Sequence, residues 1–170
     1  MDKKDALSML KVMFQSKQMK NAITPKTPEE EKKIIEQYDN KFPNKIFKMT
    51  RMDWSCRPTG MSFSKDSETW ILDAECKMGY YAKYGDGKIS DVIEMTMKQA
   101  SYDKFIELLR ENFKNEKSDR NGADGEGWEM ILYDGCGNIV NTICGYIYGN
   151  EYLNKIVTYL KNEHQLSQFM

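Results

Sequence analysis

The sequence predicts an α+β protein, built on a mostly antiparallel sheet of about five to six strands with helices packed on one face. Three observations predict this class: apolar residues recur at helical spacing near both ends, they alternate at period two in between, and short turns separate the alternating segments. A chain of 170 residues suits one structural unit. Within it we expect an N-terminal helical arm over residues 1–41 and an α+β domain over residues 42–170.

Two helices are expected before the sheet. In residues 3–20, apolar side chains at Leu7, Leu10 and Phe14 recur on one helical face. The second helix begins after Thr27, a favoured N-cap, and Glu30 completes a capping box. Proline at the first helical position and Pro43 beyond the helix set its limits. Its predicted buried stripe consists of Ile34, Ile35 and Tyr38.

From residue 46 the period changes to two, which predicts strands. The first, "IFKMTRMDW", shifts phase between Met49 and Met52, and we expect a β-bulge near Thr50. A single half-buried strand is predicted for "TWILDAECKM", with its apolar face formed by Trp70, Leu72, Ala74, Cys76 and Met78. The strand "KISDVIEMTMK" follows a turn that contains the favoured hairpin pair Asp86 and Gly87.

The rest of the chain predicts a helix, a hairpin and a last helix. Ser101 is the expected N-cap of "YDKFIELLRENF". Two strands, "WEMILY" and "NIVNTICGYIY", follow, and the turn "DGCGN" joins them. The last helix is expected over about residues 150–163. Because these glycines precede strands and not a helix, they predict a hairpin turn and no phosphate-binding loop.

Common catalytic and cofactor motifs are missing from the sequence. It has no P-loop and no G-x-G-x-x-G, its four cysteines lack metal-site spacing, and His164 is its single histidine. Cys136, at the predicted hairpin tip, has no neighbouring group in the sequence that would activate a thiol. We therefore expect no catalytic residue, no cofactor and no metal centre. One alternative stays open, a weak cation site formed by Asp119, Asp124 and Glu126.

Tyrosines and basic residues are the candidate partner-binding residues. Tyrosine is enriched at protein interfaces, which singles out two tyrosine clusters and their lysines: Tyr80, Tyr81, Lys83, Tyr84, Lys88, Tyr146 and Tyr148. Charge is unevenly spread, with 13 basic against 8 acidic residues in 1–57, although the whole chain carries a net charge of −1. A phosphate or an acidic partner could contact the basic stretch Lys41, Lys45, Lys48, Arg51 and Arg57.

The leading functional hypothesis is a non-enzymatic protein that binds another protein, as a regulator or inhibitor of bacterial or mobile-element type. One alternative is nucleic-acid binding through the basic stretch in residues 41–57, which the acidic remainder disfavours. The other is a hydrolase that uses Asp73, Glu75 or Glu94. No apolar stretch is long enough for a membrane span, and no signal peptide is apparent, so we expect a cytoplasmic protein with no membrane partner.

The last quarter of the chain resembles a pattern seen in small uncharacterised bacterial proteins. The pattern consists of D-G-x-x-W, an alternating strand, a glycine turn, a second strand that ends in glycine, and a short amphipathic helix. It is carried here by Asp124, Gly125, Trp128, Gly137, Gly145, Leu153 and Leu160. The sequence departs from it after Gly145, where "YIYGNEYL" stands in place of a segment with proline before the helix. The resemblance implies a fold and no activity.

Overall fold

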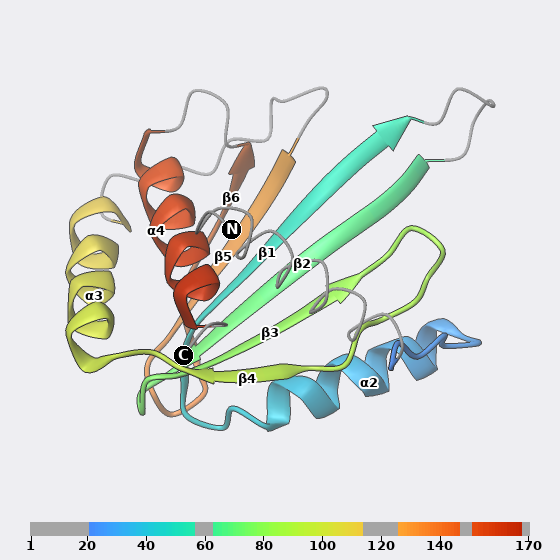
Figure 1. The fold of residues 1–170 in the computed structure, drawn as a ribbon, viewed down its shortest axis with the longest axis horizontal. Helices are drawn as coiled ribbons and strands as arrows, with labels where there is room; N and C mark the ends of the chain where they lie inside the picture. The colour runs from blue at the N-terminus through green and yellow to red at the C-terminus, as the bar shows by residue number, and fades with distance from the viewer. Residues whose placement is uncertain (1–20, 57–62, 114–125, 147–150, 168–170) are drawn as a thin grey trace, which may run out of the picture.

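The computed structural model describes residues 21–56, 63–113, 126–146 and 151–167. Its elements, labelled as in Figure 1, are α2 (Pro28–Asn40), β1 (Lys45–Cys56), β2 (Phe63–Asp73), β3 (Lys77–Lys83), β4 (Ile93–Thr96), α3 (Gln99–Phe113), β5 (Glu126–Tyr133), β6 (Ile139–Tyr146) and α4 (Glu151–Ser167). The helix predicted for residues 3–20 lies outside the described residues.

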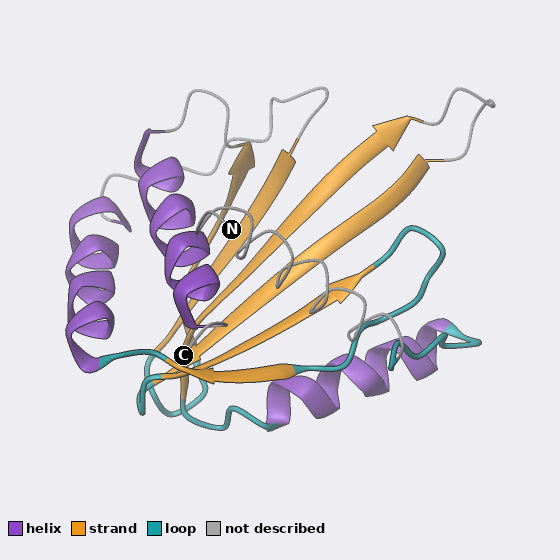
Figure 2. Cartoon of the chain, viewed as in Figure 1, coloured by secondary structure: helices purple, strands orange, loops and turns teal. Residues whose placement is uncertain are grey.

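One antiparallel sheet of six strands forms the centre of the molecule, in the order β4-β3-β2-β1-β5-β6 (Figure 2). The predicted α+β class and antiparallel sheet are confirmed. Strands β1 to β4 follow one another as neighbours. The chain then passes through α3 and returns as β5 on the other side of β1, where Arg51 lies opposite Trp128.

The helices lie on both faces of the sheet, which corrects the expectation that they cover one face. Helices α3 and α4 lie side by side on the β5–β6 side of the molecule, and α2 lies along the β4 edge (Figure 1). The core under α3 and α4 includes Trp70 and Leu72, whereas α2 packs with Ile71 and Tyr81 in a second cluster. Neighbouring residues of a strand point to opposite faces, so β2 and β3 are buried on both sides.

Aromatic contacts join the strands and helices of the larger core. Trp70 of β2 and Trp128 of β5 stack with their ring centres 6.2 Å apart across β1. Phe105 of α3 meets Phe47 of β1 edge-on at 5.3 Å and stacks on Tyr159 of α4 at 5.9 Å. The fully buried Phe47 and Phe105 therefore fix α3 and α4 against the first strands of the sheet.

Helix α2 begins as its capping signals predict. The backbone N–H of Glu30 donates to Thr27 Oγ1 at 3.1 Å, and the Glu30 carboxylate accepts from the backbone N–H of Lys26 at 2.7 Å. The reciprocal bond of the predicted capping box thus falls one residue earlier than in the standard motif. Of the expected stripe, Ile34 and Tyr38 are buried, and the Tyr38 hydroxyl donates to the carbonyl of Ser90 at 3.0 Å.

Two strand predictions are wrong. The register of β1 is continuous from Phe47 to Cys56, so there is no bulge near Thr50, and its irregularity lies between Lys45 and Phe47. The stretch predicted as one strand is a hairpin, in which β2 ends at Asp73 and β3 starts after a short turn. The buried Asp73 carboxylate stabilises this turn by accepting the backbone N–H groups of Glu75 at 2.8 Å and Lys77 at 2.9 Å. Within the turn, Ala74 is exposed and Cys76 is buried with φ 63°.

The other turns and helix limits agree more closely with the predictions. Gly87, at φ +88°, follows Asp86 in the predicted turn, where the backbone N–H of Tyr84 donates to the carbonyl of Lys88 at 2.8 Å. Helix α3 starts at Gln99, before the predicted cap at Ser101. Helix α4 ends at residue 167, four residues beyond the predicted limit, and buries Ile156, Val157 and Leu160.

Candidate interaction surface

The turn between β5 and β6 is a hairpin turn whose backbone N–H groups hydrogen-bond to the carboxylate of a residue in the turn itself. Gly135 and Gly137 both have positive φ, at +81° and +89°, and the backbone N–H of Asp134 donates to the carbonyl of Asn138 at 3.0 Å. Backbone N–H groups of Cys136 and Asn138 converge on Asp134 Oδ1 at 2.8 and 3.1 Å, and the Asn138 amide donates to Oδ2 at 2.8 Å. Bonds from Asn138 and Cys136 lower the pKa of Asp134 below its usual value. Because these N–H groups already donate to the Asp134 carboxylate, they are not available to bind an external anion.

The first predicted tyrosine cluster does not form a common surface. Tyr80 and Tyr81 are 8% and 4% exposed and belong to the two separate cores on opposite faces of the sheet. Tyr84 is partly buried against the larger core. Lys83 forms an ion pair with Glu31 of α2, and Lys88 pairs with Asp86 in its own turn at 3.1 Å. Tyr148, and the side chain of Tyr146, lie outside the described residues.

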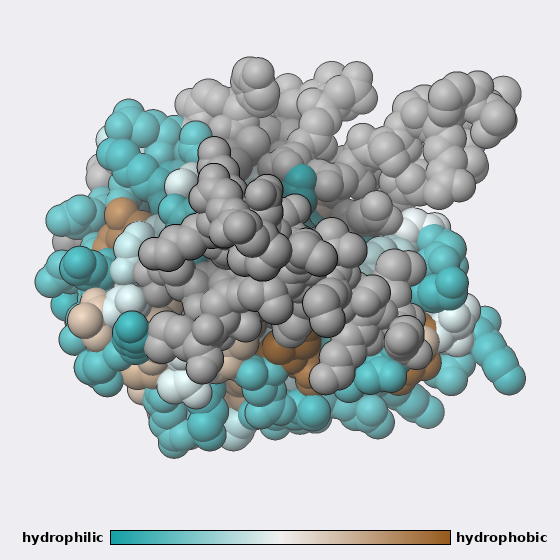
Figure 3. All heavy atoms as spheres, viewed as in Figure 1, coloured by the Kyte–Doolittle hydropathy of each residue, from teal (hydrophilic) through white to brown (hydrophobic). Residues whose placement is uncertain are grey.

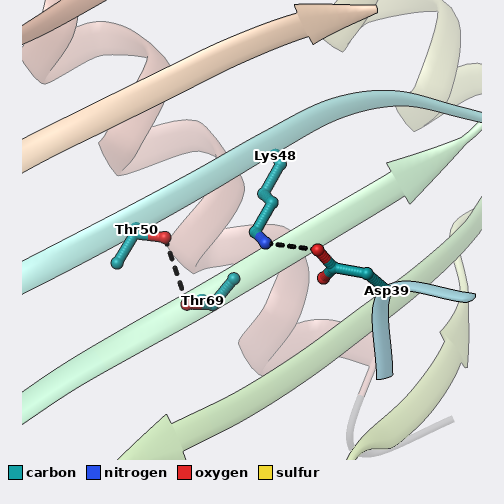
Figure 4. A network of polar contacts seen from close by, with 4 residues as sticks. All are labelled: Asp39, Lys48, Thr50 and Thr69. Carbon is teal, nitrogen blue, oxygen red and sulfur yellow. Dashed lines mark hydrogen bonds and ion pairs between the residues drawn. The ribbon is translucent and has the colours of Figure 1, made fainter. Parts of the chain in front are cut away.

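The basic stretch is divided between the two faces of the sheet, and three of its members are paired with acids. Lys41 lies 3.5 Å from Glu94. On the α2 face, Lys48 Nζ contacts Asp39 Oδ2 at 2.7 Å (Figure 4). On the opposite face, Arg51 contacts Glu68 Oε2 at 2.8 Å. Arg57 lies outside the described residues, and Lys45 contacts the ring of Tyr133.

A polar ladder runs across three strands next to the Asp39–Lys48 pair. The hydroxyls of Thr50 and Thr69 are 3.1 Å apart (Figure 4), and Thr69 also hydrogen-bonds with Tyr81. These three residues lie directly opposite one another on β1, β2 and β3. Burial raises the pKa of Tyr81 to about 12, against the opposing effect of the Thr69 bond. The ladder therefore stabilises the sheet beneath α2 with a neutral tyrosine.

The candidate hydrolytic carboxylates are not brought together. Asp73 is occupied by its turn, as described above. Glu75 is exposed and lies 3.3 Å from Lys77, and Glu94 is exposed and pairs with Lys41. Within the described ranges, no group of three His, Cys, Asp or Glu residues could hold a metal ion. For the candidate cation site, Asp119, Asp124 and the side chain of Glu126 lie outside those ranges.

Strand β6 forms an uncharged edge of the sheet. It pairs with β5 and has no second neighbour among the described strands. Its eight residues, IVNTICGY, contain no charged residue and no proline. Ile139 and Val140 are 61% and 65% exposed. The sequence contains a signal for this edge in the uncharged run "NIVNTIC". Its alternation predicts a strand, but does not show that the strand lies at an edge of the sheet.

An apolar pocket of about 400 Å³ adjoins this edge. It lies between α3 and the strands β1, β5 and β6, and its lining comprises Ile46, Ile106, Leu109, Arg110, Leu132, Tyr133, Val140 and Asn141. Lys45 contacts one of these lining residues, with its Nζ 5.4 Å from the centre of the Tyr133 ring. The sequence singles out Lys45 as part of a basic stretch, but Arg110 belongs to no distinguishing pattern and was not predicted.

Two further findings bear on function. Comparisons of the chain with protein-family models, curated proteins and solved structures find no match, and the resemblance of the last quarter to small bacterial proteins stays a prediction. No helix in the described part of the chain is both long and apolar enough to cross a membrane.

Proposed function

We propose that this protein binds another protein, and that an extended segment of the partner adds to the sheet along β6. The observation that carries the proposal is the edge itself, an eight-residue strand with no charged residue and with exposed Ile139 and Val140. Strand addition forms main-chain hydrogen bonds, and neighbouring side chains supply specificity. A binding role without catalysis is that of a regulator or inhibitor, which we propose as the class of function, together with a cytoplasmic location.

The two edges of the sheet differ in the features that normally prevent strand addition. Natural edge strands are often short or carry charged side chains, which keep other chains away. Strand β4 has both features, since it is four residues long and its Glu94 pairs with Lys41. Strand β6 has neither of them. Its difference from β4 supports β6 as the binding edge.

Neither alternative function gains support. Nucleic-acid binding relies on lysines and arginines that neutralise phosphates from one surface. Here Lys48 and Arg51 face opposite sides of the sheet, and each is already paired with a carboxylate. A hydrolase would need at least two carboxylates with divergent environments near one reacting bond. The structure places Asp73 in a turn and leaves Glu75 and Glu94 exposed.

The test is a charge added to the edge. Val140 and Thr142 are exposed positions of β6, so Val140→Lys with Thr142→Lys gives the edge the protection seen in other sheets. The matched control adds two lysines at exposed positions elsewhere, through Gln37→Lys on α2 and Thr96→Lys on β4. Circular dichroism and thermal unfolding establish that both variants fold as the parent does.

Affinity purification from cells that naturally produce the protein then compares the three forms. We expect the parent and the control to recover the same stoichiometric partner and the edge variant to lose it. Equal recovery by the edge variant would contradict the proposal, and so would a monomeric parent with no stoichiometric partner. Sedimentation of the purified chain identifies a second copy as the partner if the parent is a dimer and the edge variant a monomer.

A further inference from the structure

We infer that the partner segment carries an apolar side chain beside an acidic one, the first filling the pocket next to β6 and the second facing Arg110 and Lys45. This inference rests on the proposed function, because it concerns the strand that would add to β6. It goes further by naming the chemistry of the partner. Three observations carry it: the position of the pocket, its apolar lining, and two cations, Arg110 in the lining and Lys45 over the ring of Tyr133.

The pocket lies where an added strand could reach it. Two of its lining residues, Val140 and Asn141, belong to β6 itself. Asn141 pairs with Leu132 of β5, another lining residue. A strand added to β6 would lie roughly 4.8 Å away and send every second side chain toward the α3 side of the sheet. One such side chain would lie next to Asn141, at the pocket.

The lining selects an apolar side chain. Ile46, Ile106, Leu109, Leu132 and Val140 supply aliphatic surface from β1, α3, β5 and β6. A volume of about 400 Å³ exceeds what a single side chain needs, so a large residue such as leucine, phenylalanine or methionine fits. Burial of such an anchor is the usual source of affinity at the centre of an interface.

The charges select a carboxylate. Among the described residues, no carboxylate forms an ion pair with Arg110 or Lys45. The nearest acid in sequence to Tyr133 is Asp134, whose oxygens already accept the turn hydrogen bonds. The described surface in Figure 3 is mostly hydrophilic, with small hydrophobic areas between. Arg110 in the lining, and Lys45 over the ring of the lining residue Tyr133, therefore complement a partner that is both acidic and apolar.

The same charges argue against a second copy of the chain as the occupant. A copy paired edge to edge through β6 would present the strand IVNTICGY, which contains no acidic residue. It could not supply a carboxylate to Arg110 from that strand. An acidic segment of a different protein meets both requirements.

The test uses a displayed library of random ten-residue peptides, selected on the immobilised full chain. We expect the selected peptides to carry Asp or Glu near a large apolar residue. On the Arg110→Glu variant, selection should favour Lys or Arg in place of the acid. A peptide selected on the parent should bind this variant at least about 10-fold more weakly, and its affinity for the parent should fall with added salt.

Matched variants separate the possible outcomes. Arg110 and Lys104 are both exposed on α3, so Lys104→Glu makes the same charge change away from the pocket. We expect it to leave affinity within about twofold. If Arg110→Glu selects the same acidic peptides as the parent, or if the parent selects no peptide above background, the inference is overturned. In the first case, loss of those peptides on a Thr142→Lys variant, which alters the edge but not the lining of the pocket, would leave the proposed function standing. Acidic peptides that bind that edge variant as tightly as the parent would overturn strand addition, and with it the proposed function.

Discussion

The contact between Gly79 of β3 and Phe42, just after α2, predicts a steric penalty for a single methyl group. Phe42 is 1% exposed, and a Cβ added at Gly79 would lie 2.4 Å from the Cε2 and Cζ atoms of its ring. Ordinary contacts of this kind begin at 3.4 Å. In Gly79→Ala, the ring must therefore retreat by about 1 Å within a tightly packed cluster.

The size of the penalty follows from two opposing effects. Overpacking a core by a methyl group costs about 1–3 kcal/mol. Replacing glycine with alanine stabilises by about 0.4–1 kcal/mol where the backbone accepts it, because the unfolded chain loses freedom. Gly79 has no positive φ, so the backbone adds no strain. We expect a net loss of about 1–2 kcal/mol in the free energy of unfolding.

Urea unfolding of a double-mutant cycle measures this loss. Phe42→Leu is destabilising by itself, but it shortens the side chain that the new methyl group meets, so Gly79→Ala should cost much less in that background. Gly127→Ala in β5 is the control, because its added Cβ would meet nothing closer than 3.8 Å and should leave stability unchanged or slightly higher. If Gly79→Ala is neutral, or if its cost is the same with leucine at position 42, α2 does not pack on β3 as described.

Two further predictions concern titratable groups. Burial raises the pKa of Tyr81 to about 12, so the unfolded chain loses the hydroxyl proton at a lower pH than the folded chain does. The free energy of unfolding should therefore fall by on the order of 3 kcal/mol as pH rises from about 10 to about 12. Tyr81→Phe should remove that part of the alkaline loss, and an unchanged dependence of stability on pH would contradict the assignment. The lowered pKa of Asp134 means that its contribution is present above the unfolded pKa of about 3.9 and is lost as pH falls through the folded value. Urea midpoints of Asp134→Ala should therefore lie below the parent at neutral pH, and the difference should shrink as pH falls below about 3.9; a difference that persists in strong acid would show that the carboxylate charge is not the cause.

Local signals in the sequence predicted the local parts of the fold. Thr27 and Glu30 predicted the start of α2, and the glycines at 87, 135 and 137 predicted two hairpin turns, because capping and positive φ depend on neighbouring residues alone. The turn after Asp73 was missed because it contains no glycine or proline and its flanking residues continue the alternating pattern across it.

The placement of the helices depended on information that periodicity does not contain. An amphipathic stripe shows that α2 buries Ile34 and Tyr38, but not which face of the sheet receives them. A signal was available in the continuous apolar runs around Ile71 and Tyr81, which are typical of strands buried on both sides. For the candidate surface, neither the pocket nor the pairing of Lys48 with Asp39 could be predicted, since each depends on how separate elements pack against one another.

The strand order also divides the sheet into two locally connected units. Strands β1 to β4 form a meander and β5 with β6 a hairpin, and the two units meet only where β1 pairs with β5 in the described sheet. At that seam, Arg51 faces a residue 77 positions further along the chain, Trp128. Closing so long a loop costs more chain entropy than pairing strands that follow one another, and this cost slows the pairing of β1 with β5. Folding should therefore be limited by this seam, so that a substitution at Met130, which pairs with Met49 across it, slows refolding more than substitutions at positions where β2 pairs with β3.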